Sequence, residues 1–171
     1  MHICAILDKE GRTHDKLCRE RLIFMNDFKN RQSSEILKSV YKNADMAYES
    51  SGDVLKCCTD KKLRNEIAAE RERYRSVASQ ARTELVRRGS VPKPYPSYTK
   101  MMAKMGIQMK TMADNSPQKL AELMVRGTTM GIIDMQHALN RSTKAEERIK
   151  SDADALLKRE QQFCDHLKQY L

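Results

Sequence analysis

The chain has 171 residues, of which 40% are hydrophobic and 32% are charged, and its formal net charge is +9. This length is enough for one domain with a substantial apolar core, and the 6 Gly and 4 Pro leave few places for turns. No apolar run approaches the roughly 20 residues of a membrane span, and the run 3–7 lacks the cationic start of a signal peptide. The composition therefore predicts a helix-rich cytoplasmic domain.

Residues 1–32 are the least regular part of the chain, and we expect a partly helical N-terminal extension here. A helix over residues 14–31 would only partly cluster its apolar side chains, which are Leu17, Leu22, Phe24, Met25 and Phe28. A core built from residues 33–171 does not need this surface. We expect the extension either to dock on the bundle or to mediate association, with a homodimer or a protein partner as the outcome.

Two long helices are predicted next, over residues 34–58 and 61–88. Each keeps a helical period of apolar and small residues. The stripe of the first is Leu37, Val40, Tyr41, Ala44, Tyr48, Ser51 and Leu55. The stripe of the second is Leu63, Ile67, Glu70, Tyr74, Val77, Ala81 and Leu85. Thr59 and Asp60 break the chain between them, and Gly89 ends the second helix.

The segment 89–97 cannot be helical because three prolines alternate with other residues. Ser97 then caps a predicted short helix over residues 98–113, whose apolar face carries Met101, Met102, Met105, Met109 and Met112. Thioethers are soft ligands that suit Cu(I), and Met also lines adaptable partner-binding grooves. We favour the structural interpretation, in which these methionines fill gaps over the bundle.

A third long helix is predicted from Pro117 to about Asn140, capped by Ser116. Its expected stripe is Leu120, Leu123, Met124, Gly127, Gly131 and Ala138. The two glycines should allow a neighbouring helix to approach closely, so we expect Gly127→Leu to overfill the contact at a cost of about 1–3 kcal/mol. Asp134 interrupts the stripe.

A fourth helix is predicted from about Lys144 to the end of the chain. Thr143 and Glu146 have the spacing of a capping box. The expected stripe is Ile149, Ala153, Leu156, Glu160, Phe163 and Leu167.

The connection lengths predict the topology. Only two or three residues join the first two helices and the last two, so each pair should form an antiparallel hairpin. The long segment 89–116 can span a bundle of helices about 37 Å long. Two hairpins joined by one long crossover predict an all-α, ferritin-like four-helix bundle.

Residues 35–171 resemble the small, uncharacterised, stress-associated ferritin-like bundles of bacteria, which are distant relatives of rubrerythrin. Three features carry the resemblance: the Cys-Thr-Asp turn of the first hairpin, the crossover YTKMMAKMGIQMKTMAD, and the helix LAELMVRGTTMGIIDMQHALN. Metal-oxidising members carry one Glu on each of two helices and Glu-x-x-His on the other two. Here Arg73 follows Glu70 by three residues and Phe163 follows Glu160, so both expected histidines are missing.

The resemblance therefore implies a degenerate di-metal site. The remaining candidates for metal ligands are Glu70, Asp134, His137 and Glu160, with Asp134 and His137 as an i, i+3 pair on one helix. Glu70, Asp134 and Glu160 lie on inward stripes, so their carboxylates should converge and repel one another. We expect Arg71, Arg73 or Arg126 to pair with them, or Tyr48 and Tyr74 to hydrogen-bond to partly protonated acids.

Three classes of function follow. The first is a non-catalytic bundle that acts by protein association or oligomerisation, with no cofactor. The alternative is a metal-binding protein with an altered iron site. The third is nucleic-acid binding, which the net charge permits, although Lys and Arg are interleaved with Glu and Asp rather than gathered in one stripe. The five cysteines are odd in number and lack a CxxC spacing, so we expect reduced thiols.

Overall fold

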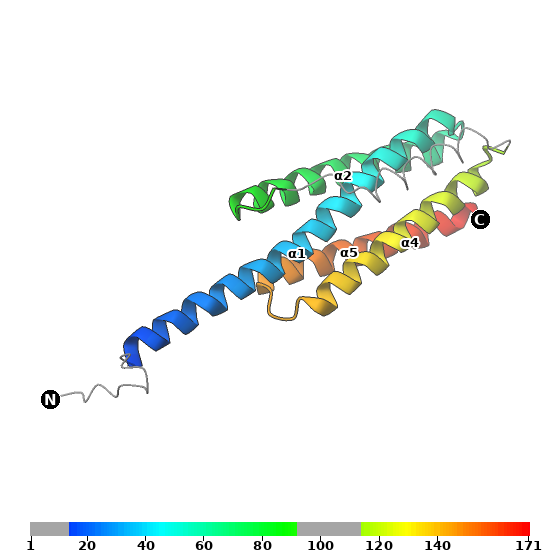
Figure 1. Cartoon of the computed structure of the whole chain (residues 1–171). Helices are drawn as coiled ribbons and strands as arrows, with labels where there is room; N and C mark the ends of the chain where they lie inside the picture. The colour runs from blue at the N-terminus through cyan, green and yellow to red at the C-terminus, as the bar shows by residue number, and fades with distance from the viewer. Residues whose placement is uncertain (1–13, 92–113) are drawn as a thin grey trace.

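The structure is a computed structural model that describes residues 14–91 and 114–171, and within these ranges it contains helices and no strand (Figure 1). The elements are α1 (His14–Cys57), α2 (Lys61–Arg87), α4 (Pro117–Arg141), α5 (Glu147–Leu167) and the short 3-10 helix η1 (Lys168–Tyr170). The prediction of an all-α chain is confirmed for this part of the protein. The short helix expected over residues 98–113, with its methionine face, lies outside the described residues.

The first helix is much longer than the sequence predicted. α1 runs without a break for 44 residues, so the helix that we expected to begin at Ser34 begins at His14 instead. The Ser33 hydroxyl donates to the Lys29 carbonyl at 2.8 Å, and the Ser34 hydroxyl donates to the Asn30 carbonyl at 2.9 Å. Because both serines bond back into the preceding turn, they continue the helix rather than capping a new one.

The turn 58–60 and the end of α2 follow the sequence prediction. The Asp60 carboxylate accepts a hydrogen bond from the Leu63 N–H at 2.7 Å, as an N-cap does. At the other end, Gly89 has a φ of 71°, which only glycine adopts without strain. The end of α2 reaches the level of Asn30 on α1, whose side-chain oxygen accepts a hydrogen bond from Arg88 at 2.8 Å.

The start of α4 is confirmed, but the start of α5 is not. The Ser116 hydroxyl accepts from the Lys119 N–H at 3.3 Å, ahead of Pro117 in the first turn. The capping box of Thr143 and Glu146 is absent, because α5 begins only at Glu147. The Glu146 N–H donates to Ser33 of α1 at 2.9 Å, and its carboxylate binds Arg88 instead. Contacts with other helices therefore decide where α5 starts.

The helices bury two separate hydrophobic clusters. α1 packs against α2, α4 and α5, and α4 packs against α5. One cluster gathers near the ends of α2 and α4 and includes Ile36, Leu85, Leu139 and Ile149. The other lies around the turn 58–60 and consists of Val54, Cys58, Leu63, Ile67, Leu120, Ala121, Met124, Phe163 and Leu167. The level between them contains buried polar side chains.

Arg88 holds the end of the bundle together. Its guanidinium binds the Glu146 carboxylate through two nitrogens, at 2.7 and 2.8 Å, and also contacts Glu84. Only 9% of its side chain is exposed. Because the pair is bidentate and the guanidinium is almost buried, it fixes the end of α2 against the start of α5 more firmly than a fully exposed pair would.

The close approach expected at Gly127 is wrong. Gly127 is exposed, and a Cβ atom placed there would have no neighbour within 4 Å. The side of α4 that is buried carries Leu120, Ala121, Met124, Thr128, Met135, Ala138 and Leu139. The real face is therefore turned by about one residue from the expected stripe, toward Thr128 rather than Gly127.

Two glycine substitutions test this correction. We expect Gly127→Ala to raise the free energy of unfolding by about 0.5–1 kcal/mol, because alanine is the better helix former and meets no neighbour. Gly89→Ala, the control, should lower it by about 1 kcal/mol because of the positive φ. Urea unfolding measures both, and a destabilised Gly127→Ala variant would contradict the exposed position.

Candidate functional site

A central polar layer separates the two hydrophobic clusters. We give this name to the buried side chains of Glu70 and Tyr74 on α2, Thr128 on α4 and Glu160 on α5. The sequence predicted the inward positions of Glu70, Tyr74 and Glu160, whereas Thr128 was missed because the stripe of α4 was assigned one residue away.

Tyr74 and Glu160 form the buried link of this layer. The Tyr74 hydroxyl donates to the Glu160 carboxyl at 2.9 Å. Burial raises the pKa of Glu160 to about 7, and the nearby charge of Glu70 adds to this effect, although the hydrogen bond from Tyr74 opposes it. Burial and the two carboxylates also raise the pKa of Tyr74, so this residue stays a hydrogen-bond donor.

The negative charge of Glu70 is compensated by an arginine rather than by a tyrosine. Its carboxylate binds Arg73, one turn along α2, at 2.6 Å. The Glu70 side chain is only 3% exposed, whereas that of Arg73 is 56% exposed, so the guanidinium reaches in from the surface. Both kinds of partner that the sequence predicted for the buried acids therefore occur: an arginine binds Glu70 and a tyrosine binds Glu160. Arg126 and Arg71 are used elsewhere, since Arg126 binds Glu122 and Arg71 stacks on the Tyr48 ring.

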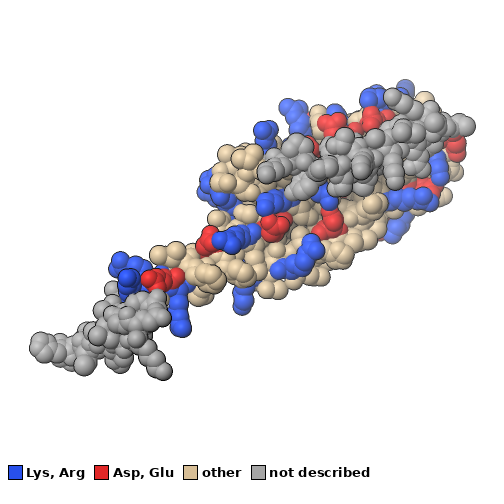
Figure 2. Space-filling model, viewed as in Figure 1, with Lys and Arg blue, Asp and Glu red and all other residues tan. Residues whose placement is uncertain are grey.

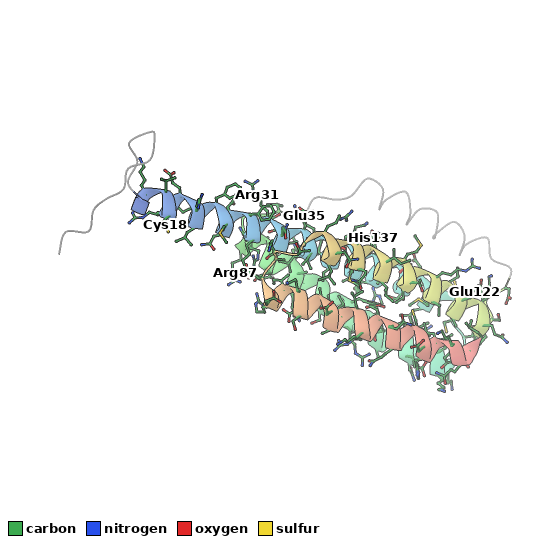
Figure 3. All side chains as sticks on the ribbon, turned by 90° about the horizontal axis from the view of Figure 1, so that it is seen from below. Cys18, Arg31, Glu35, Arg87, Glu122 and His137 are labelled. Atoms are coloured by element: carbon green, nitrogen blue, oxygen red, sulfur yellow. The ribbon has the colours of Figure 1, made fainter. Side chains whose placement is uncertain are left out.

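The other two candidate ligands are not part of this layer. Asp134 was expected to converge with Glu70 and Glu160, but it is partly exposed and binds Lys42 of α1 at 2.7 Å. His137 is exposed on α4 and labelled in Figure 3. The expectation of three converging carboxylates is thus wrong, because the buried face of α4 is turned away from Asp134. Among the residues described here, no group of three or more His, Cys, Asp or Glu side chains could hold a metal ion.

A groove lies next to the central polar layer, between α2 and α5. Its volume is about 570 Å³, and its apolar lining includes Val77, Ala81, Ala153 and Leu156. It is bounded by polar bridges: Tyr74 to Glu160 on the side of the polar layer, and Arg148 to Glu84 at 3.3 Å toward the end of α2. α2 and α5 are therefore connected mainly by long side chains along this side of the bundle.

The second notable feature is the projecting segment, which we define as residues 16–31 of α1. This part of α1 extends beyond the other helices, and Figure 3 places Cys18 and Arg31 on it. Its exposed apolar side chains are Leu22, Ile23, Phe24, Met25 and Phe28, which are 45–72% exposed. Such a group of large exposed apolar side chains is uncommon on the surface of a protein that has no partner. The sequence predicted these residues as an irregular extension rather than as part of a continuous helix.

The remaining surface shows no concentration of one charge on the visible face. In Figure 2, Lys and Arg alternate with Asp and Glu along the helices. Many of these charges are paired within one helix, for example Lys38 with Glu35 and Lys168 with Asp165. Cys18, Cys57, Cys58 and Cys164 are free thiols. Within residues 14–91 and 114–171, no helix combines the length and apolar character needed to cross a membrane.

Comparison with known proteins gives no relative. No protein-family model matches the chain, and neither does any curated protein or solved structure.

The raised pKa of Glu160 makes a prediction about stability and pH. The folded chain holds this proton more tightly than the unfolded chain, so stability should fall as the pH rises from about 4.5 to about 7. Above pH 7, the loss in the free energy of unfolding should level off at about 3 kcal/mol. Glu160→Gln should match the wild type near pH 5 and exceed it in free energy of unfolding near pH 8.

Urea unfolding across this pH range provides the measurement, and Glu147→Gln on the same helix is the matched control, because Glu147 is exposed. That control should follow the wild type at every pH. If Glu160→Gln also followed the wild type throughout, Glu160 would not be protonated in the folded protein near neutrality.

Proposed function

We propose that this chain is a non-catalytic helical bundle that works by protein association in the cytoplasm. In this proposal the helices form two antiparallel hairpins joined by a ferritin-like crossover, and the projecting segment of α1 is the contact surface. The observation that carries the proposal is the exposure of Leu22, Phe24, Met25 and their neighbours on a helix that extends beyond the bundle.

The central polar layer supports the non-catalytic part of this proposal. Arg73 binds Glu70, and Tyr74 binds Glu160, so both buried carboxyl groups already interact with side chains of α2. Asp134 and His137, the other candidates for an iron site, lie apart from this pair. A layer in which each acid has its own partner is suited to a structural role.

The projecting segment supports the association part. An exposed hydrophobic helix face costs free energy in water, and it is stabilised when a partner covers it. The segment contributes no residue to either hydrophobic cluster of the bundle. Its apolar side chains are therefore available for contact without unfolding the core.

The experiment compares the native size of the tagged, full-length chain in extracts of its source cells with that of a Phe24→Glu/Phe28→Glu variant. We expect the wild type in an assembly larger than a monomer, and the variant as a monomer. Both residues are exposed, so the free energy of unfolding should change by less than about 0.5 kcal/mol.

The matched control is Met130→Glu/Ile133→Glu, which changes two exposed apolar residues of α4 outside the projecting segment. This control should keep the assembly. If the wild type itself is a monomer in the extract, or if the control variant loses the assembly equally, association through the projecting segment is refuted.

A further inference from the structure

Four apolar residues of the projecting segment form a stripe on one side of α1, whereas the exposed Leu22 and Ile23 lie on other sides of the helix. An α-helix has 3.6 residues per turn, which places successive side chains about 100° apart. On this basis Leu17, Phe24, Phe28 and Met25 share one side of α1. That side lies roughly a third of a turn away from the one that Ile36, Val40 and Ala44 turn toward the bundle. The stripe is therefore a second surface rather than an extension of the bundle interior.

One charged residue lies within this stripe. Arg21 comes four residues after Leu17, three before Phe24 and seven before Phe28, so it occupies the middle of the apolar face. Any partner helix that covers the stripe must therefore also accommodate the guanidinium of Arg21. Glu20 and Arg31 lie along one edge of the same stripe, with Asp27, which binds Arg31 at 2.7 Å.

We infer that the partner of the projecting segment is the same segment of a second copy of this chain, packed antiparallel. This inference rests on the proposed function and names its partner. With a two-fold axis between Met25 and Asn26, each Glu20 comes level with Arg31 of the second copy, and each Phe24 lies beside Phe28 of the second copy. The segment thus complements itself in both charge and apolar surface.

A parallel pair lacks this complementarity. Each residue would then face its own copy, so Arg21 would oppose Arg21 in the middle of the apolar contact, and Arg31 would oppose Arg31. In the antiparallel pair the two Arg21 side chains are nine residues apart along the axis, which is about 14 Å. This separation exceeds the screening length of about 8 Å at physiological salt.

Cysteine cross-linking of the purified, full-length chain tests both the partner and the direction. Two variants are compared after Cys4 and Cys57 are changed to Ser. The first keeps the exposed Cys18. The second carries Cys18→Ser and Met25→Cys. In the antiparallel pair, the two copies of residue 25 adjoin the axis, whereas the two copies of Cys18 are 15 residues apart, or about 22 Å.

We expect a short bis-maleimide to link two chains through Met25→Cys and not to link them through Cys18. Sedimentation should show a dimer for the purified wild type and at least a tenfold weaker dimer for Phe24→Glu/Phe28→Glu. Equal cross-linking at both positions would mean a parallel pair and would overturn the inference, as would a dimer that the double substitution leaves intact.

A purified chain that remains a monomer at all concentrations would also overturn it. In that case the extract experiment separates the two proposals: an assembly lost only in Phe24→Glu/Phe28→Glu would leave the proposed function standing with a different partner. Binding of the purified monomer to anionic lipid vesicles would instead assign the stripe to a membrane surface. A monomer in both experiments would refute the proposed function as well.

Discussion

Two carboxyl groups, Glu70 and Glu160, are buried in the middle of a helical bundle, and the structure depends on how each of them is compensated. A buried and unpaired carboxylate would cost several kcal/mol of stability. Arg73 compensates Glu70 by reaching in from the surface with its charge, at 2.6 Å. Tyr74 compensates Glu160 with a hydrogen bond inside the bundle, and the raised pKa of about 7 leaves this acid largely protonated below neutral pH.

This arrangement explains the organisation of the core. The central polar layer divides the apolar residues into one cluster near the turn 58–60 and another near Arg88. Along α2 and α5 the two helices are connected by side chains rather than by close backbone packing, through Tyr74 with Glu160 and Arg148 with Glu84. The groove of about 570 Å³ lies between these two bridges. The surface that we propose for association is separate from all of this, on the part of α1 that leaves the bundle.

The sequence predicted helices and their buried sides well where the apolar period is regular. On α2, six of the seven expected stripe residues are among its buried residues, and on α5 Ile149, Glu160 and Phe163 are buried as expected. The caps at Asp60 and Ser116 and the end at Gly89 were also predictable, because each depends on one residue and its neighbours in sequence.

The errors arose where a contact with a distant residue decides the outcome. Asp134 binds Lys42, which is 92 residues away in the sequence, so helical spacing alone could not show that it faces outward. Glu146 resembles a capping residue but binds Arg88, 58 residues away. On α4, glycines and small residues weaken the apolar period, and an error of one position turned the expected face from Thr128 to Gly127.

The most direct test of this account is a pH titration of the Glu160 side-chain carboxyl by carbon-13 NMR in the folded, full-length protein. A midpoint near 7 is the predicted result, because the burial of this group and its contact with Tyr74 define the central polar layer. A midpoint near the ordinary value of about 4.3 for glutamate would contradict the account. It would mean that Glu160 is solvated or bound to a cation, and that the layer is not closed by Tyr74.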